Sequence, residues 1–160
     1  MRPAILILAI ALSACEEGNP GASVDYDAMN RAAEGPARQI DPQPIGTGEL
    51  TRFGLSRGTC VVPGANHREN LFAASREKGI MRIDFETMEF APRPTSDPLP
   101  NNVANGFDGT DYQVELTVDR SSETPAGPEQ LFFNGTLTVR DARERIVFEH
   151  RGRVECSWPG

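Results

Sequence analysis

The sequence predicts a mainly β domain: a small antiparallel sandwich or barrel of about six to seven strands, closed by one disulfide. Three observations carry this prediction. From Glu49 onward, short segments with alternating apolar and polar residues are separated by loops rich in proline, glycine and asparagine. No long helical period interrupts them. Two cysteines, Cys60 and Cys156, lie near the first and the last of these segments.

The first half of the domain predicts a hairpin and one long strand. Residues 49–62 favour one or two irregular strands. Residues 71–75 and 79–90 flank REKG and predict the two arms of a hairpin. In the second arm Met81, Ile83 and Phe85 occupy one parity, and Met88 and Phe90 occupy the other. This pattern predicts a single strand with a bulge near Thr87.

The second half predicts three strands and two polar loops. Residues 91–110 and 121–129 are the loops, on either side of a strand over 111–120. The last two strands, 131–140 and 146–156, form a hairpin around DARER. Parity places two sets of residues, and also His150, on the inner face of this hairpin: Leu131, Phe133, Leu137 and Val139; then Ile146, Phe148, Val154 and Cys156.

The chain opens with a short apolar run between a basic residue and two small ones. Arg2 precedes residues 4–12, and Ser13 and Ala14 follow. This arrangement is typical of a secretory signal peptide. A membrane-spanning anchor would need about 20 apolar residues, which is more than this run has. A buried strand or helix at the N-terminus is the other alternative.

Leu12, Ser13, Ala14 and Cys15 resemble the lipobox of bacterial lipoproteins: a leucine, two small residues and a cysteine. The resemblance covers the first fifteen residues. It implies that Cys15 takes a diacylglycerol on its thiolate, and that cleavage between Ala14 and Cys15 exposes an amine for a further acyl chain. Because Glu16 follows, and not aspartate, it also implies the periplasmic face of the outer membrane, with the inner membrane as the alternative.

The expected organisation has three parts. Residues 1–14 are the signal peptide, 15–47 the lipidated N-terminus and a flexible tether, and 48–160 the β domain. The tether is poor in large apolar side chains and rich in glycine and proline, so little offsets the entropy of ordering it. Residues 24–34 favour a short helix within it.

Lipidation of Cys15 leaves an even number of cysteines. The periplasm is oxidising, so Cys60 and Cys156, which are 96 residues apart, are expected to form a disulfide. Two separately buried thiols are the alternative, and no zinc-ligand spacing occurs. Cleavage removes Arg2, so the formal charge goes from −7 to −8. An acidic surface argues against a nucleic-acid partner.

Few residues suggest catalysis. His67 and His150 are candidate bases or metal ligands, although a loop residue and a core histidine explain them more simply. The oxygen-rich segment 101–111, with Asp108 and Asp111, is a weak calcium candidate, but turn formation also explains its composition. Asp84 and Glu86 are outward carboxylates without a predicted pocket. No cofactor motif occurs.

The sequence thus favours a non-enzymatic envelope lipoprotein that binds a protein, peptidoglycan or a small ligand. Its architecture is similar to that of the periplasmic lysozyme inhibitors, which are small β lipoproteins closed by disulfides. Inhibition of an enzyme is therefore one option within the expected binding function. The alternative is a metal- or calcium-assisted periplasmic enzyme with its site in the 101–111 loop, near His67.

Overall fold

The computed structural model describes residues 25–33, 35–95 and 97–158, and the chain divides into two compact units, Met1–Gly35 and Pro36–Gly160. In the first unit, helix α1 (Tyr26–Ala33) confirms the short helix predicted over 24–34. Asp25 directly precedes the helix and caps it, because its Oδ1 accepts a hydrogen bond from the N–H of Ala28 at 2.9 Å. The predicted signal peptide and lipobox lie outside the described residues.

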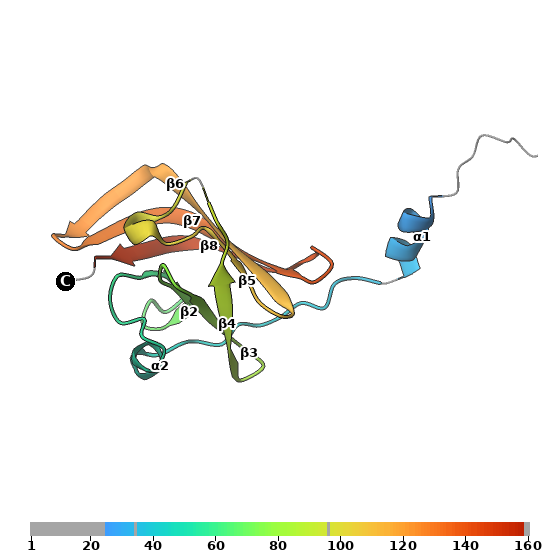
Figure 1. The fold of residues 1–160 in the computed structure, drawn as a ribbon, viewed down its shortest axis with the longest axis horizontal. Coiled ribbons are helices and arrows are strands. Elements are labelled where there is room, and N and C mark those ends of the chain that lie inside the picture. The colour runs from blue at the N-terminus through green and yellow to red at the C-terminus, as the bar shows by residue number, and fades with distance from the viewer. Residues whose placement is uncertain (1–24, 34, 96, 159–160) are drawn as a thin grey trace, which may run out of the picture. The chain divides into compact units, whose positions relative to one another are not determined.

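The second unit is a closed barrel of eight antiparallel strands, in which consecutive strands are neighbours and β1 pairs with β8 (Figure 1). The mainly β antiparallel fold is therefore confirmed, as a barrel with more strands than the six to seven predicted. The strands are β1 Cys60–Pro63, β2 Asn70–Ala74, β3 Gly79–Ile83, β4 Glu86–Pro92, β5 Gly106–Asp108, β6 Tyr112–Gly127, β7 Gln130–Asp141 and β8 Ile146–Ser157.

The prediction of a single bulged strand over residues 79–90 is wrong. The strand ends at Ile83 and a new one starts at Glu86, because Asp84 and Phe85 form a two-residue turn. Their φ angles are 50° and 67°, and positive φ at both central residues is the property of a type I′ hairpin turn. Glycine or asparagine usually signals such a turn. Phenylalanine gives no such signal.

Two predicted loops also contain strand. Strand β5 lies within the predicted loop 91–110, and its three residues are too few to show a period. Strand β6 continues to Gly127, so most of the predicted loop 121–129 lies within this strand, and Thr124, Pro125 and Gly127 pair with β7 beyond a register shift. At this shift the Asp119 carboxylate accepts hydrogen bonds from the hydroxyl and N–H of Ser121, at 2.6 and 2.9 Å, which lower its pKa.

A bulge at the start of β8 corrects one inner-face prediction. The β7–β8 register shifts between Val139 and Arg140, so Ile146 lies exposed and Val147 takes the buried place. Beyond the shift, Phe148 lies opposite Val139, as parity predicted. The same register puts Val154 opposite Phe133 and Cys156 opposite Leu131.

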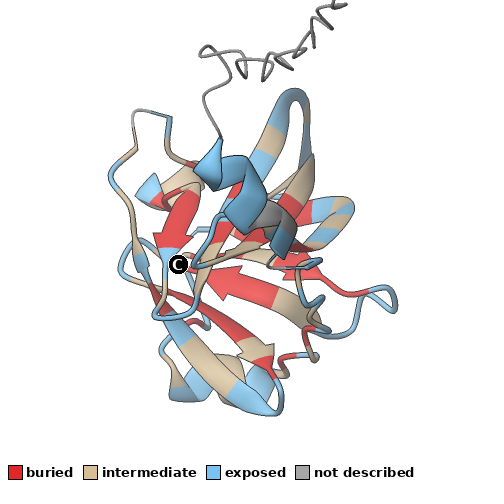
Figure 2. Cartoon of the chain, turned by 90° about the vertical axis from the view of Figure 1, so that its right-hand side faces the viewer, coloured by how far each residue is buried: buried red, intermediate tan, exposed pale blue. Residues whose placement is uncertain are grey.

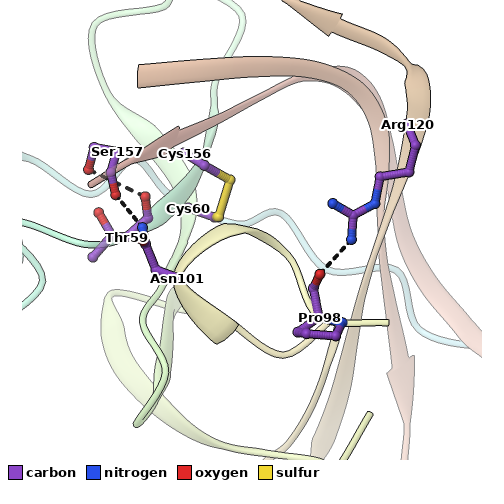
Figure 3. Close-up of a disulfide and its surroundings, with 7 residues drawn as sticks. All are labelled: Thr59, Cys60, Pro98, Asn101, Arg120, Cys156 and Ser157. Carbon is purple, nitrogen blue, oxygen red and sulfur yellow. Dashed lines mark hydrogen bonds between the residues drawn. A yellow bond between two sulfur atoms is a disulfide. The ribbon is translucent and has the colours of Figure 1, made fainter. Parts of the chain in front are cut away.

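The loop between β4 and β5 covers the end of the barrel that holds the disulfide. Leu99, Val103 and Ala104 are buried in the main core, on both sides of the short 3-10 helix η1 (Pro100–Asn102). Figure 3 shows Asn101 beside the disulfide, where its Nδ2 donates to the carbonyl oxygen of Ser157 at 2.5 Å. The Arg120 guanidinium of β6 donates to the Pro98 carbonyl at 2.5 Å.

Residues 36–45, the N-terminal strap, cross the opposite end of the barrel. The N–H of Ile40 donates to Val147 of β8 at 3.1 Å, and that of Gln43 to Arg82 of β3 at 2.8 Å. Ile45 is fully buried and exchanges hydrogen bonds with Asn70 of β2 at 2.7 and 3.1 Å.

Part of the segment predicted as tether thus belongs to the barrel unit. This unit begins at Pro36, and helix α2 (Thr47–Arg52) follows the strap. Composition missed the strap because Ile40 and Ile45 are isolated apolar residues among prolines and polar residues. Their contacts are with distant strands, which local patterns do not show.

Side chains fill the barrel interior. Phe72 is fully buried, and its ring meets those of Phe107 and Phe90 edge to face, with centroids 5.4 and 6.4 Å away. Figure 2 shows buried residues along the strands and exposed residues at the turns. An eight-stranded barrel is just wide enough for side chains to fill or for one small ligand. Here the side chains occupy it.

One carboxylate organises the turn between β7 and β8. Asp141 Oδ1 accepts the backbone N–H groups of Arg143 and Arg145, at 2.9 and 3.0 Å, and Oδ2 accepts Nε and Nη2 of Arg145 at 2.8 and 2.7 Å. Desolvation raises the pKa of Asp141. The hydrogen bonds from Arg145 and Arg143 outweigh it, so the pKa lies below its usual value.

We expect Asp141→Asn to lower the free energy of unfolding by about 1–2 kcal/mol at pH 7. A lowered folded-state pKa stabilises the fold above the unfolded pKa of about 4, and this contribution is lost as pH falls through the folded value. Urea unfolding from pH 7 to pH 3 should therefore show the difference from wild type shrinking below about pH 4. Asp111→Asn, at an exposed turn, is the control, and a difference independent of pH would contradict the prediction.

Candidate binding surface

The tip of the β3–β4 hairpin presents an aromatic side chain to solvent. Phe85 is 80% exposed, the most exposed of the large apolar residues in the described part of the chain. It has the positive φ of 67° that bulky residues rarely adopt. A strained conformation persists only where the surrounding structure holds it, and such residues cluster at functional sites.

The N-terminal strap holds this tip in place. Gln43 accepts a hydrogen bond from the N–H of Phe85 through Oε1 at 2.8 Å, while its own N–H donates to the Arg82 carbonyl at 2.8 Å. The Arg38 guanidinium lies 3.8 Å from the Asp84 carboxylate, on the other side of the turn, with both side chains exposed. The segment predicted as a flexible tether thus positions the most exposed aromatic residue of the barrel unit.

A hollow beside Phe85 has a polar, charged floor. The Thr87 hydroxyl of β4 donates to Glu49 of α2, and Arg82 Nη1 lies 3.9 Å from the second Glu49 oxygen. Arg82 Nε is buried and has no hydrogen-bond partner among the described residues. The hairpin-tip surface, as we name Phe85 with this hollow, is lined by Gly48, Glu49, Arg52, Phe53, Arg82, Glu86 and Thr87.

The two candidate carboxylates lie on either side of Phe85 and not on one strand face. Asp84 is in the turn and Glu86 opens β4, where it pairs with Ile83. Both are exposed. The structure therefore corrects their predicted position two residues apart along one strand, because the turn separates them.

The two histidines belong to different parts of the barrel unit. His67 is exposed in the loop between β1 and β2, where its N–H donates to the Gly64 carbonyl at 3.0 Å. His150 lies opposite Leu137 on the inner face, as predicted, and its ring stacks on Phe148 with a centroid distance of 6.5 Å. The stack accounts for its half-buried position.

The weak calcium candidate is a turn region. Asp108 ends β5 and its carboxylate lies 3.5 Å from Arg93 Nε, while Asp111 is exposed in the β5–β6 turn. The Gly109 N–H donates to the Tyr112 carbonyl at 2.8 Å, which closes this turn. Within residues 25–33, 35–95 and 97–158, no group of three or more His, Cys, Asp or Glu side chains is placed to hold a metal ion.

The predicted disulfide is present. Cys60 and Cys156 are bonded, fully buried and directly opposite each other across the β1–β8 pair, with Cα atoms 4.0 Å apart. The proposed lipidation site at Cys15 and cleavage site at Ala14 lie outside the described residues. In the described part of the chain, no helix is long and apolar enough to cross a membrane.

Sequence reasoning placed Phe85 on the buried face of a strand and so missed the surface that it dominates. Only the turn geometry exposes it, and no glycine or asparagine marks that turn. No family model matches the chain, and no curated protein or solved structure matches it significantly. The site therefore has to be interpreted from its own chemistry.

Proposed function

We propose that this chain is a lipid-anchored envelope protein whose barrel binds a protein partner through the hairpin-tip surface, without catalysis. The anchor is the acylated Cys15, and the location is the periplasmic face of the outer membrane. Inhibition of an envelope enzyme is one form that such binding takes.

Phe85 is the observation that carries the binding role. Exposed aromatic residues act as anchors when they enter a pocket on a partner, and they supply much of the energy of protein interfaces. An exposed phenylalanine with positive φ costs conformational free energy and buries no apolar surface in the monomer. Binding of a partner to this side chain explains why it is found there. The side chains filling the barrel argue against a small ligand in its interior.

The disulfide supports export. Such bonds persist in the periplasm and are rare in the cytosol, where thiols are kept reduced. The Cys60–Cys156 bond closes the barrel between its first and last strands. It also fits a signal peptide that leads the chain out of the cytosol and a lipobox that consumes the third cysteine.

We expect Phe85→Gly to separate stability from binding. Glycine adopts positive φ without the steric penalty that phenylalanine pays, so the free energy of unfolding should rise by about 1 kcal/mol. The same change removes the aromatic anchor. Affinity capture of envelope proteins with the full mature chain should then lose the partner that wild-type bait retains.

Asp84→Asn is the matched variant, because it changes the other residue of the same turn and asparagine tolerates positive φ. It should keep both stability and capture. If Asp84→Asn and Phe85→Gly both lose the partner, the loss does not depend on the aromatic side chain, and the role of Phe85 as a binding anchor would be contradicted. Capture of peptidoglycan, with no protein depending on Phe85, would contradict the proposed partner class.

A further inference from the structure

Helix α1 has an apolar stripe along one face. Tyr26 is 71% exposed and Met29 is 59% exposed, and with Ala33 they lie at positions i, i+3 and i+7 of one helix face. Asp27 lies on the opposite face, in the first turn. Figure 2 shows the described residues of α1 as exposed.

A helix this short needs a surface to lie on. Isolated helices shorter than about 12–15 residues are marginal in water, and most helical stability in proteins comes from packing an apolar face. Helix α1 has 8 residues, and those whose burial is described are all exposed. Its Asp25 side chain accepts a hydrogen bond from the Ala28 N–H, and such a cap by itself does not replace packing of the helix face.

The position of the helix in the chain indicates which surface this is. Tyr26 follows Cys15 by eleven residues, a length that reaches at most about 40 Å when extended and about 18 Å on average when flexible. A bilayer holding the Cys15 lipid would therefore always be within reach of the helix. Weak interfacial binding then becomes intramolecular, and tethering raises its effective concentration.

We propose that α1 lies in the interface of the bilayer as a second membrane contact, with Tyr26 and Met29 turned toward the acyl chains. This inference rests on the lipid anchor of the proposed function and deepens it. Amphipathic helices bind in this way, and tyrosine suits the headgroup level because its ring is apolar and its hydroxyl polar. Asp25 and Asp27 favour a zwitterionic surface over an anionic one.

The contact would shorten the link between the bilayer and the barrel. The barrel unit begins at Pro36, directly after the unit that contains α1. With the helix held in the interface, the strap starts close to the lipid surface. The barrel would then act near the bilayer, and not at the far end of a long flexible tether.

The test uses the full mature chain, purified from membranes and reconstituted in phosphatidylcholine vesicles. Met29→Cys carries an environment-sensitive dye, and Asp27→Cys, on the opposite face, carries the same dye as the matched control. An intact mass of each protein first shows whether Cys15 is the acylated N-terminus. We expect the emission at position 29 to shift to the blue and to be quenched by spin-labelled acyl chains, and the control to report water.

The outcomes separate the two proposals. An acylated chain whose dye at position 29 reports water would overturn the membrane contact alone. An unacylated chain that retains residues 1–14 would overturn both the anchor and the contact that depends on it.

Adding Tyr26→Ser to the labelled Met29→Cys protein should weaken the quenching while leaving the acylated mass unchanged. Quenching that persists undiminished would show that the stripe does not hold the helix in the interface.

Discussion

Replacing Cys60 and Cys156 with alanine is expected to lower the free energy of unfolding by about 4 kcal/mol, within the range of 2–5 kcal/mol found for native disulfides. The bond closes a loop of 96 residues, and cross-linking a loop of this length strongly restricts the unfolded chain. It also lies where the barrel closes. Among the described residues β1 and β8 share only two register pairs, Cys60 with Cys156 and Val61 with Glu155.

Denaturant unfolding of the double variant and of wild type measures this effect. Wild type reduced with dithiothreitol is the matched control, because it loses the cross-link and keeps both sulfur atoms in the core. A similar loss in both would assign the effect to the cross-link, while a much smaller loss in the reduced protein would assign it to packing. Hydrogen exchange at Val61 and Glu155 should accelerate first, since these residues pair beside the bond. Unchanged stability in both proteins would contradict the prediction.

The regular features of the barrel were accessible from the sequence. Alternation over β7 predicted its inner face because the strand packs one side on the core. The number of cysteines predicted the disulfide, because assigning Cys15 to the lipobox left two cysteines that could pair. These features are local or countable, so a single sequence carries them.

The features around the candidate site were not accessible. The turn at Asp84 and Phe85 lacks a turn residue at its second position, so the change of parity after Phe85 was interpreted as a bulge within one strand. The strap contacts the turn through Gln43 and Arg38, whose partners Arg82, Phe85 and Asp84 are about 40 residues or more away in the sequence. The bulge that exposes Ile146 likewise depends on the register with β7. The turn, the strap and the bulge each depend on pairing between residues far apart in the sequence, and local residue propensities carry no information about such pairing.

The same limit hides the packing inside the barrel, where the second large effect is expected. Phe72→Ala should lower the free energy of unfolding by about 3–5 kcal/mol, because it leaves a cavity beside Phe90 and Phe107. Gly79→Ala should lower it by about 1–3 kcal/mol for the opposite reason. A Cβ at position 79 would lie 2.7 Å from Cζ of Phe72, in a core with no room for it.

The two changes should therefore compensate in part, because the alanine at 79 would fill space that the Phe72 ring had occupied. We expect the double variant to lose less stability than the two single losses added together, by at least about 0.5 kcal/mol in denaturant unfolding. Gly64→Ala is the matched glycine control, since its Cβ would meet its nearest neighbour at an ordinary 3.5 Å and should change little. If Phe72→Ala does not fold, Phe72→Leu leaves a smaller cavity and can be compared with Gly79→Ala, alone and combined, in the same way. Strict additivity of positions 72 and 79 would mean that the ring and the glycine do not compete for the same space, and the account of a tightly filled barrel would then be wrong.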